Sequence, residues 1–173
     1  NPCPCGYAGS LPEGRCRCPV TTVDRYERRV SGPLRDRIDL WIRMPRVAPA
    51  ALVGGPDPES SVVVGARIRT ARAIAAARND GWWNATLRGR RLRLACGLRA
   101  DARIRVAELA DADATSGRGT ERLLRVARTI ADLDGTGRVT IGHLEEAAWF
   151  RSAAARTERA LASRPYALKS AEV

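Results

Sequence analysis

The stretch from Arg118 to Gly135, RGTERLLRVARTIADLDG, carries the pattern that most constrains the fold. Apolar side chains recur there at the spacing of one helical face, and glycines follow at the point where a helix typically ends. The pattern therefore predicts an amphipathic helix that packs against other elements along one side. The positions at helical spacing are Leu123, Ala127, Ile130 and Asp134, and the apolar face is widened by Leu124, Ala131 and Leu133.

The composition favours further helices. Hydrophobic residues make up 45% of the 173-residue chain but aromatic residues only 5%, so a core must be built from Ala, Leu, Val and Ile. No apolar run is long enough to span a membrane and no signal peptide precedes the cysteines, so we expect a cytoplasmic protein without a membrane partner. Further helices are expected in residues 22–30, in 59–79 with a stripe of Val64, Ile68, Ala71 and Ala75, in 101–113, and after the N-cap Thr140.

One short strand is expected near residues 38–44. Ile38, Leu40 and Ile42 alternate there with polar or larger residues, and Pro45 closes the run. A segment rich in Pro and Gly follows at 48–60 and is expected to be a linker. The stretch 80–97 is expected to be a connection, with no element assigned to it.

The excess of positive charge indicates a polyanion as a partner. The formal net charge is +11, and of the 30 basic residues only Lys169 is a lysine, so the charge is carried by guanidinium groups that suit phosphates. Trp82 and Trp83 precede an arginine cluster and could stack on unpaired bases, so this stretch is a candidate contact with DNA. The alternative is that the tryptophans pack inside and the arginines are solvated. The cluster consists of Arg88, Arg90, Arg91 and Arg93.

Four of the five cysteines lie near the start of the chain, in two Cys-x-Cys pairs separated by ten residues. Four thiolates in two close pairs can bind zinc tetrahedrally, once the intervening loop brings the pairs together. Two disulfides, less favoured in a reducing compartment, and a reduced loop without metal are the alternatives. The four are Cys3, Cys5, Cys16 and Cys18; Cys96 is expected to be a small buried hydrophobe, and His143 to be structural.

A series of motifs resembles the C-terminal part of the magnesium-chelatase-like AAA+ ATPases of the ComM/YifB type: NPCPCG, CRC, YERRVSGPLRDRIDL, NATL, SGRGTERLLRVARTIADL and HLEEAAWFR. The resemblance runs from Asn1 to about Arg151. It implies a mainly α chain that begins with the C-terminal edge of an α/β AAA+ core and continues with a helical lid. The implied parts are the core edge with the four-cysteine loop (1–46), a linker (47–59), the lid (60–151), and a helical extension and tail (152–173).

The resemblance also implies roles for single residues. Asn1 matches the sensor 1 asparagine, and Arg118, at the start of the predicted helix, matches the sensor 2 arginine; both would bind nucleotide. Arg37 matches the arginine finger that reaches the γ-phosphate held by a neighbouring subunit. From the residues alone, Arg37 could instead pair with Asp36 or Asp39. The next basic residues along the predicted helix, Arg122 and Arg125, are expected on a solvated face.

The resemblance implies a hexameric motor that uses ATP and Mg²⁺ to drive branch migration of DNA during uptake and recombination. The chain holds no G-x-x-x-x-G-K-[ST] loop and does not begin with Met, so we expect it to be the trailing part of a longer ATPase and inactive alone. Two alternatives stay open. One is a non-enzymatic, zinc-binding and basic module that binds nucleic acid or acts as an adaptor; the other is a chelatase-type motor subunit.

Overall fold

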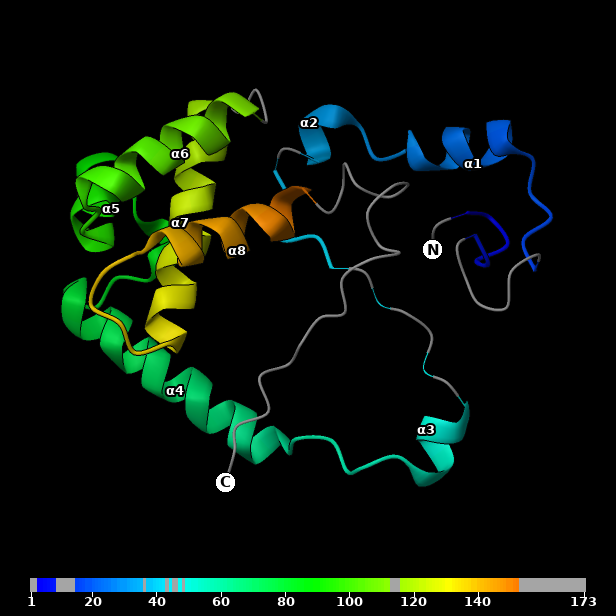
Figure 1. Cartoon of the computed structure of the whole chain (residues 1–173), viewed down its shortest axis with the longest axis horizontal. Coiled ribbons are helices and arrows are strands. Elements are labelled where there is room, and N and C mark those ends of the chain that lie inside the picture. The colour runs from blue at the N-terminus through cyan, green and yellow to red at the C-terminus, as the bar shows by residue number, and fades with distance from the viewer. Residues whose placement is uncertain are drawn as a thin grey trace.

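The computed structural model describes residues 3–8, 15–35, 37–42, 44, 47, 49–112 and 116–152, and it is mainly helical (Figure 1). Short helices precede residue 60, one of them inside the expected linker, and longer helices pack together after it. The helices are α1 (Val20–Glu27), α2 (Gly32–Arg35), α3 (Pro49–Gly54), α4 (Ser61–Arg78), α5 (Gly89–Cys96), α6 (Ala100–Ala112), α7 (Gly117–Leu133) and α8 (Ile141–Ser152), with a 3₁₀ turn η1 (Asn84–Thr86) between α4 and α5.

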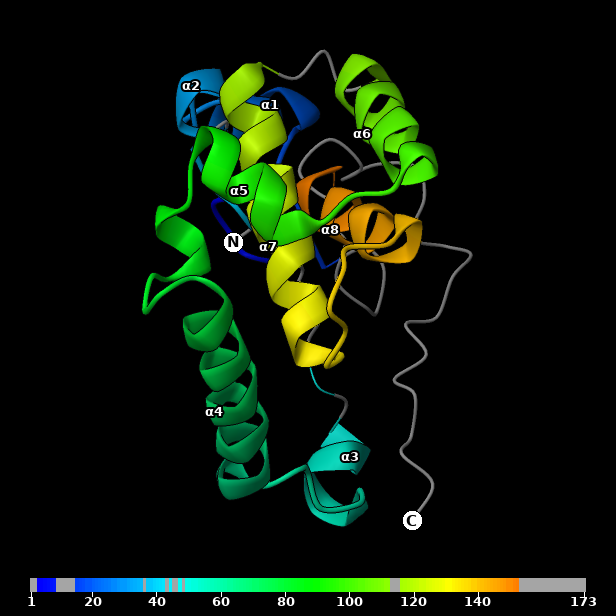
Figure 2. The same cartoon turned by 90° about the vertical axis from the view of Figure 1, so that its left-hand side faces the viewer.

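Helix α7 is the centre of the packed part of the chain (Figure 2). It contacts α4, α5, α6, α8 and η1. The amphipathic helix predicted for this stretch is confirmed, because its apolar face is buried, whereas Leu133 at its end is 48% exposed. Full burial of one such leucine or isoleucine stabilises the fold by about 1.5–3 kcal/mol. The core consists of Leu87, Leu92, Ala95, Cys96, Ala102, Leu123, Leu124, Ala127, Ile130, Ala131, Val139, Leu144 and Ala147.

Side chains before the helices fix where several of them begin. Ser60 Oγ accepts a hydrogen bond from the Val63 N–H (3.4 Å), and Ser116 Oγ accepts one from the Gly119 N–H (3.3 Å). Each bond satisfies one of the backbone donors that the first turn of a helix leaves without a partner. The expectation that α8 starts after Thr140 is confirmed, and the Thr140 N–H donates to His143 Nδ1 at 3.0 Å.

Only the C-terminal half of α4 packs against the core. Ala71 and Ala75 are buried, as their place in the predicted stripe requires, but Ile68 is 42% exposed and Val64 is only partly covered. In Figure 2 the N-terminal half of α4 extends away from α7. The prediction of one continuous buried stripe is therefore wrong for its first half.

The strand expected near residues 38–44 is not found in the described part of that segment, residues 38–42 and 44. The one backbone hydrogen bond recorded there runs from the Trp41 N–H to the Phe150 carbonyl at the end of α8 (2.9 Å). Alternation of apolar residues makes a strand only where a second strand supplies the ladder, and no strand lies within the described residues. Leu40 and Ile42 consequently remain 46% and 62% exposed.

The stretch 80–97, expected to be a connection, contains η1 and α5. Leu92, Ala95 and Cys96 on α5 are buried against α7, and Gly97 ends the helix in the left-handed region at φ +56°. Arginines interrupt the apolar spacing of α5 in the sequence, so its helical character depends on packing against α7. The expectation that Cys96 is a buried small hydrophobe is confirmed, since its exposure is 0%.

Candidate functional site

The four N-terminal cysteines converge. All four Sγ atoms lie within 4.8 Å of one another. The Cys3 Sγ is 3.3 Å from that of Cys5 and 3.7 Å from that of Cys16, and the Cys5 and Cys16 sulfurs are 3.6 Å apart. All four thiols are free, so the structure contains neither of the disulfides considered above. This arrangement of four soft donors could hold a metal ion.

The thiols of this cluster differ in acidity. Burial opposes ionisation of Cys3, but hydrogen bonds from the Cys5 thiol and the Ala8 N–H outweigh it and lower the pKa of Cys3 to about 6. The backbone N–H of Cys18 favours ionisation of Cys16, yet burial and the neighbouring thiols prevail and raise the pKa of Cys16. Cys3 therefore ionises more readily than an ordinary thiol, whereas Cys16 resists losing its proton unless a nearby cation compensates the charge of its thiolate.

Arg37 lies in the turn after α2 and is exposed. Its N–H donates to the Leu34 carbonyl (3.0 Å), and no carboxylate of the described residues pairs with its guanidinium. Asp39, one of its two alternative partners, instead faces Arg122 on α7, with 3.5 Å between Oδ1 and Nε. The other alternative partner, Asp36, lies outside the described residues. The Arg37 guanidinium is therefore accessible from solvent.

Arg118 lies in the first turn of α7, as the sequence predicted, and its side chain is exposed. A Cβ placed on Gly117, the first residue of the helix, would meet no atom within 4 Å, whereas the Gly119 N–H is capped by Ser116. The partial positive charge of the helix N-terminus and the exposed Arg118 guanidinium lie together there, and this combination could attract a phosphate group. The expected sensor 1 residue, Asn1, lies outside the described residues.

The next two arginines of α7 are not on a solvated face, so that prediction is wrong. The side chain of Arg122 is 18% exposed and that of Arg125 only 12%. Arg122 pairs with Asp39, and Arg125 contacts Glu121 (3.6 Å) and donates to the Leu87 carbonyl (3.4 Å). The segment that carries Arg37 is thus attached to the helix that carries Arg118.

The arginine cluster around α5 is exposed at its four predicted positions, Arg88, Arg90, Arg91 and Arg93. Trp82 and Trp83 are 53% and 56% exposed, so they do not pack inside. The Arg91 guanidinium lies 5.6 Å from the ring centre of Trp82, and that of Arg72 lies 5.3 Å from the ring centre of Trp83. Each of the two neighbouring, exposed indoles therefore has a guanidinium group over its ring, and the four residues of these two pairs are here called the Trp–Arg surface (Trp82, Trp83, Arg72 and Arg91).

Two family models match the chain. The model described as magnesium chelatase, subunit ChlI C-terminal, matches residues 58–151, and the model described as magnesium chelatase, subunit ChlI, matches residues 1–52. The first match alone covers more than half of the chain. The chain belongs to the magnesium chelatase ChlI family.

Relatives of this ChlI-family chain include the two proteins that its motifs resemble, so the resemblance is confirmed. The chain is 36% identical over 154 residues to the uncharacterized protein YifB of Escherichia coli. It is 32% identical over 154 residues to the competence protein ComM of Haemophilus influenzae. Each of these alignments covers 88% of the chain and 29% of the relative. An uncharacterized Mycobacterium tuberculosis protein is 36% identical over 159 residues, which is 90% of the chain and 31% of that protein. The chain therefore spans less than a third of the length of these relatives.

Among the helices described for this ChlI-family chain, none combines the length and apolar character that crossing a membrane requires.

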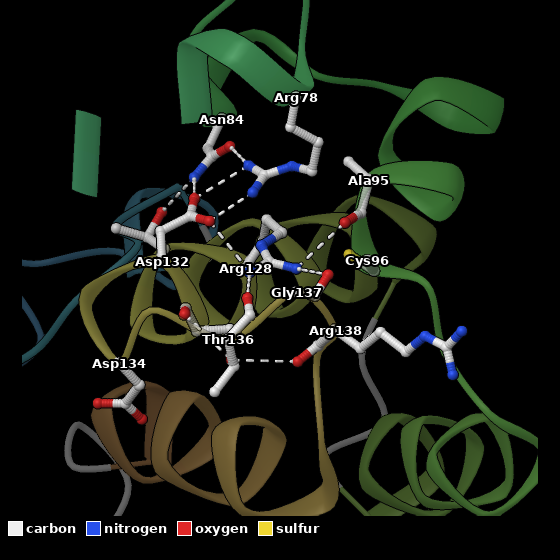
Figure 3. Close-up of polar contacts among 12 residues, drawn as sticks. Arg78, Asn84, Ala95, Cys96, Arg128, Asp132, Asp134, Thr136, Gly137 and Arg138 are labelled. Atoms are coloured by element: carbon white, nitrogen blue, oxygen red, sulfur yellow. Dashed lines mark hydrogen bonds and ion pairs between the residues drawn. The ribbon is translucent and has the colours of Figure 1, made fainter. Parts of the chain in front are cut away.

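The ChlI-family chain contains a buried ion-pair network that its sequence did not predict (Figure 3). Asp132 on α7 is 2% exposed and pairs with Arg78 from α4 and with Arg128 one turn earlier on α7 (3.0 Å). Asn84 from η1 donates to Asp132 Oδ2 (2.7 Å) and accepts from Arg78 Nη2 (2.8 Å). One carboxylate therefore joins α4, η1 and α7. One feature of the sequence could have indicated this network: Arg128 and Asp132 have opposite charges and lie four residues apart, next to the apolar face of the predicted helix.

Arg128 is the most enclosed charge of this network, with 0% exposure. Burial lowers the pKa of the Arg128 guanidinium, and the adjacent Asp132 carboxylate opposes that shift. Its Nη atoms also donate to the carbonyls of Ala95, Thr136 and Gly137 at 2.7–3.2 Å, whereas its Nε finds no partner within the described part of the chain. Arg128 thereby ties the end of α5 to the turn after α7 (Figure 3).

Proposed function

We propose that this chain supplies the helical lid and the arginine finger of an ATP-driven AAA+ ring motor that acts on DNA. In this proposal the lid is formed by residues 60–151, the core edge by residues 1–46, and the linker by residues 47–59. The nucleotide and its Mg²⁺ would be held mainly by a phosphate-binding loop outside this sequence, and the ring would be a hexamer. Membership of the ChlI family supports the motor, and the name of one relative, competence protein, fits a role in DNA uptake.

The observation that carries the proposal is the attachment of the Arg37 segment to α7. Asp39, two residues after Arg37, pairs with Arg122, and Arg122 lies one turn after Arg118 on the same helix. A second contact, from the Trp41 N–H to the Phe150 carbonyl, joins this segment to the end of α8. A movement of the lid on nucleotide binding would therefore displace the arginine that faces the neighbouring subunit.

The two exposed arginines would have different tasks. Arg118, at the N-terminus of α7, would contact phosphate of the bound nucleotide and close the lid over it. Arg37 would reach the nucleotide of the adjacent subunit and stabilise negative charge that develops during phosphoryl transfer. Asn1 would orient the attacking water, as the sensor 1 residue.

Replacing Arg118 by alanine in the full-length protein is expected to weaken ATP binding about 10–100-fold. The reason is the loss of a charged hydrogen bond worth about 1.5–3 kcal/mol. The measurement is the dissociation constant of a fluorescent ATP analogue. Arg103→Ala, an exposed arginine on α6, removes the same charge and should leave the constant unchanged. Equal constants for Arg118→Ala and Arg103→Ala would remove Arg118 from the nucleotide site.

The Trp–Arg surface supports DNA as the substrate of the motor. Exposed indoles suit stacking on unpaired bases, and guanidinium groups beside them suit the phosphate backbone. Trp82 and Trp83 are more than half exposed, and each already has an arginine on its face. We therefore place contact with single-stranded segments of the DNA on this surface, beside α5 and its arginine cluster.

Replacing Trp82 by alanine is expected to weaken binding of a short single-stranded oligonucleotide to the chain about 5–100-fold, because one stacked base contributes about 1–3 kcal/mol. Fluorescence anisotropy at fixed, low salt measures the affinity. Trp82→Phe retains a stacking face and should recover most of the binding. Wild-type affinity for Trp82→Ala would exclude Trp82 from the contact.

Two other functions make different predictions. A non-enzymatic zinc-binding, nucleic-acid-binding or adaptor module would occur without an upstream phosphate-binding loop, so the reading frame before Asn1 distinguishes it from a motor. A chelatase-type motor subunit would hydrolyse ATP in response to a metal-insertion partner and not to DNA. Stimulation of ATPase activity by branched or single-stranded DNA favours the proposed function over both.

A further inference from the structure

The described residues before α4 share no hydrophobic core. Among the described residues before Ala71, Cys3 is the only buried one. Helix α1 buries no side chain, and its first residue, Val20, is 75% exposed. Among the described residues, burial of apolar area therefore contributes little to holding residues 3–8 and 15–27 together. Segments of this kind are usually held by disulfides or by a metal ion.

The distances between the sulfurs fit a single tetrahedral ion. Zinc bonds to thiolate sulfur at about 2.3 Å, which places tetrahedral sulfurs about 3.8 Å apart. The separations of 3.3–3.7 Å among Cys3, Cys5 and Cys16 are close to this value, and Cys18 completes the set within 4.8 Å. A disulfide bond would need about 2.05 Å. Four protein ligands would leave no position for water, so the ion would be structural and not catalytic.

The backbone around the cluster also supports metal binding. The Gly6 N–H donates to the Cys3 carbonyl (3.0 Å), and Gly6 has a φ of +82°, so the chain turns tightly around the first pair of thiols. The Ala8 N–H donates to the Cys3 Sγ (3.3 Å). Such N–H···S contacts orient a thiolate ligand and partly neutralise its charge.

Positive charges next to the four cysteines are opposite in sign to the charge of the zinc complex that they would form. Four thiolates and one Zn²⁺ have a net charge of −2. Arg15 and Arg17 flank Cys16, and both are exposed on the same short segment. The Arg15 guanidinium lies 5.0 Å from the ring centre of Tyr7, which follows the first cysteine pair, so the two arms of the loop also contact each other outside the cluster.

We propose that Cys3, Cys5, Cys16 and Cys18 bind one Zn²⁺ ion through four thiolates, and that this ion, in place of a hydrophobic core, holds the segment that leads into α1. Each thiol releases its proton to solvent when it binds, and no electron is transferred. The inference goes beyond the proposed motor function and does not depend on it, because the cluster involves neither the lid nor a nucleotide.

The first test is the metal content of the whole 173-residue chain, purified without chelator and without a metal-affinity step. Elemental analysis should give about one zinc per chain. Replacement of zinc by Co²⁺ should give the visible absorption bands of a tetrahedral thiolate site. Less than about a tenth of a zinc per chain in protein with free thiols, no such bands with Co²⁺, iron with sulfide in place of zinc, or two disulfides under non-reducing conditions would each overturn the proposal.

A pair of cysteine variants tests the ligands. Cys16→Ser should lower zinc affinity more than about 100-fold, since even changes behind the ligands typically cost 10–100-fold. Cys96→Ser is the matched control, because Cys96 is buried in the hydrophobic core beside α7 and is not one of the four clustered cysteines. Removing zinc from the wild type should speed hydrogen exchange in α1 and leave α7 unchanged. Equal zinc affinities of the two variants would contradict the proposal. A rate of hydrogen exchange in α1 that stays the same after zinc is removed would contradict it as well.

Discussion

Asp132→Ala is expected to lower the free energy of unfolding of the chain by about 3–5 kcal/mol. The carboxylate is 2% exposed and lies between the Arg78 and Arg128 guanidinium groups. Removal of one partner from a buried ion pair typically has this effect, because the remaining charge stays buried without compensation. Here two charges would remain, and Arg128 cannot reach solvent. Asn84 Nδ2 would also lose the closer of its two acceptors among the described residues (2.7 Å) and keep only Thr129 Oγ1 (3.2 Å).

Chemical denaturation followed by circular dichroism measures this loss. Asp134→Ala is the control: the residue lies two positions further on, its side chain is 58% exposed, and its carboxylate contacts the buried His143 ring (3.2 Å). Loss of this single, partly exposed hydrogen bond should cost about 0.5–1.5 kcal/mol, the net contribution of a typical hydrogen bond. Asp132→Asn should fall between the two, because it keeps part of the hydrogen bonding. A loss below about 1 kcal/mol for Asp132→Ala would show that the network does not hold α4 and η1 on α7.

Local patterns were sufficient to predict most helices from the sequence. The predicted 118–135 helix became α7 (Gly117–Leu133), and the N-cap Thr140 marked the start of α8. These helices have a spacing of apolar residues, a cap or a glycine end within one segment, so no distant residue was needed to recognise them. The place of Arg118 at a helix terminus followed from the same pattern.

The wrong predictions concern residues whose structure depends on a partner far away in the sequence, which a local pattern does not contain. Ile38, Leu40 and Ile42 alternate as in a strand, but no strand pairs with them in the described residues. Arg122 was assigned to solvent, yet Asp39, far away in the sequence, partly covers it. The Asp132 network joins three elements, and no short stretch of sequence contains all its members.

The two candidate sites differed in how far the sequence could describe them. The cysteine pairs predicted the cluster directly, because spacing alone restricts how far apart the two thiols of a Cys-x-Cys pair can lie. The attachment of Arg37 to the lid through Asp39 and Arg122 could not be predicted, because Arg37 was weighed only against its neighbours Asp36 and Asp39. The exposed pairs of arginine and tryptophan likewise required the fold, since their rings belong to one connection and Arg72 to α4.

Arg37→Ala in the full-length protein is expected to lower ATP turnover about 10³-fold or more, with ATP binding nearly unchanged. An arginine finger stabilises charge that develops only during phosphoryl transfer, so its loss affects the chemical step and not the affinity for ATP. Arg118→Ala should differ by weakening nucleotide binding as well. Arg37→Lys should recover little, because an ammonium group cannot reproduce the planar fork of a guanidinium. Steady-state turnover and ATP affinity, measured on the same preparation, separate these outcomes.

Mixing two inactive variants tests the central claim, that Arg37 acts on the nucleotide of the neighbouring subunit. One variant is Arg37→Ala, and the other carries a mutation in the phosphate-binding loop expected upstream. In a mixed ring, an intact loop of the first variant can meet an intact Arg37 of the second, so ATPase activity should rise above that of either variant alone. Activity of the mixture that stays at the level of the separate variants, in rings that have assembled, would contradict the account. Arg37→Ala rings with wild-type turnover would do so as well.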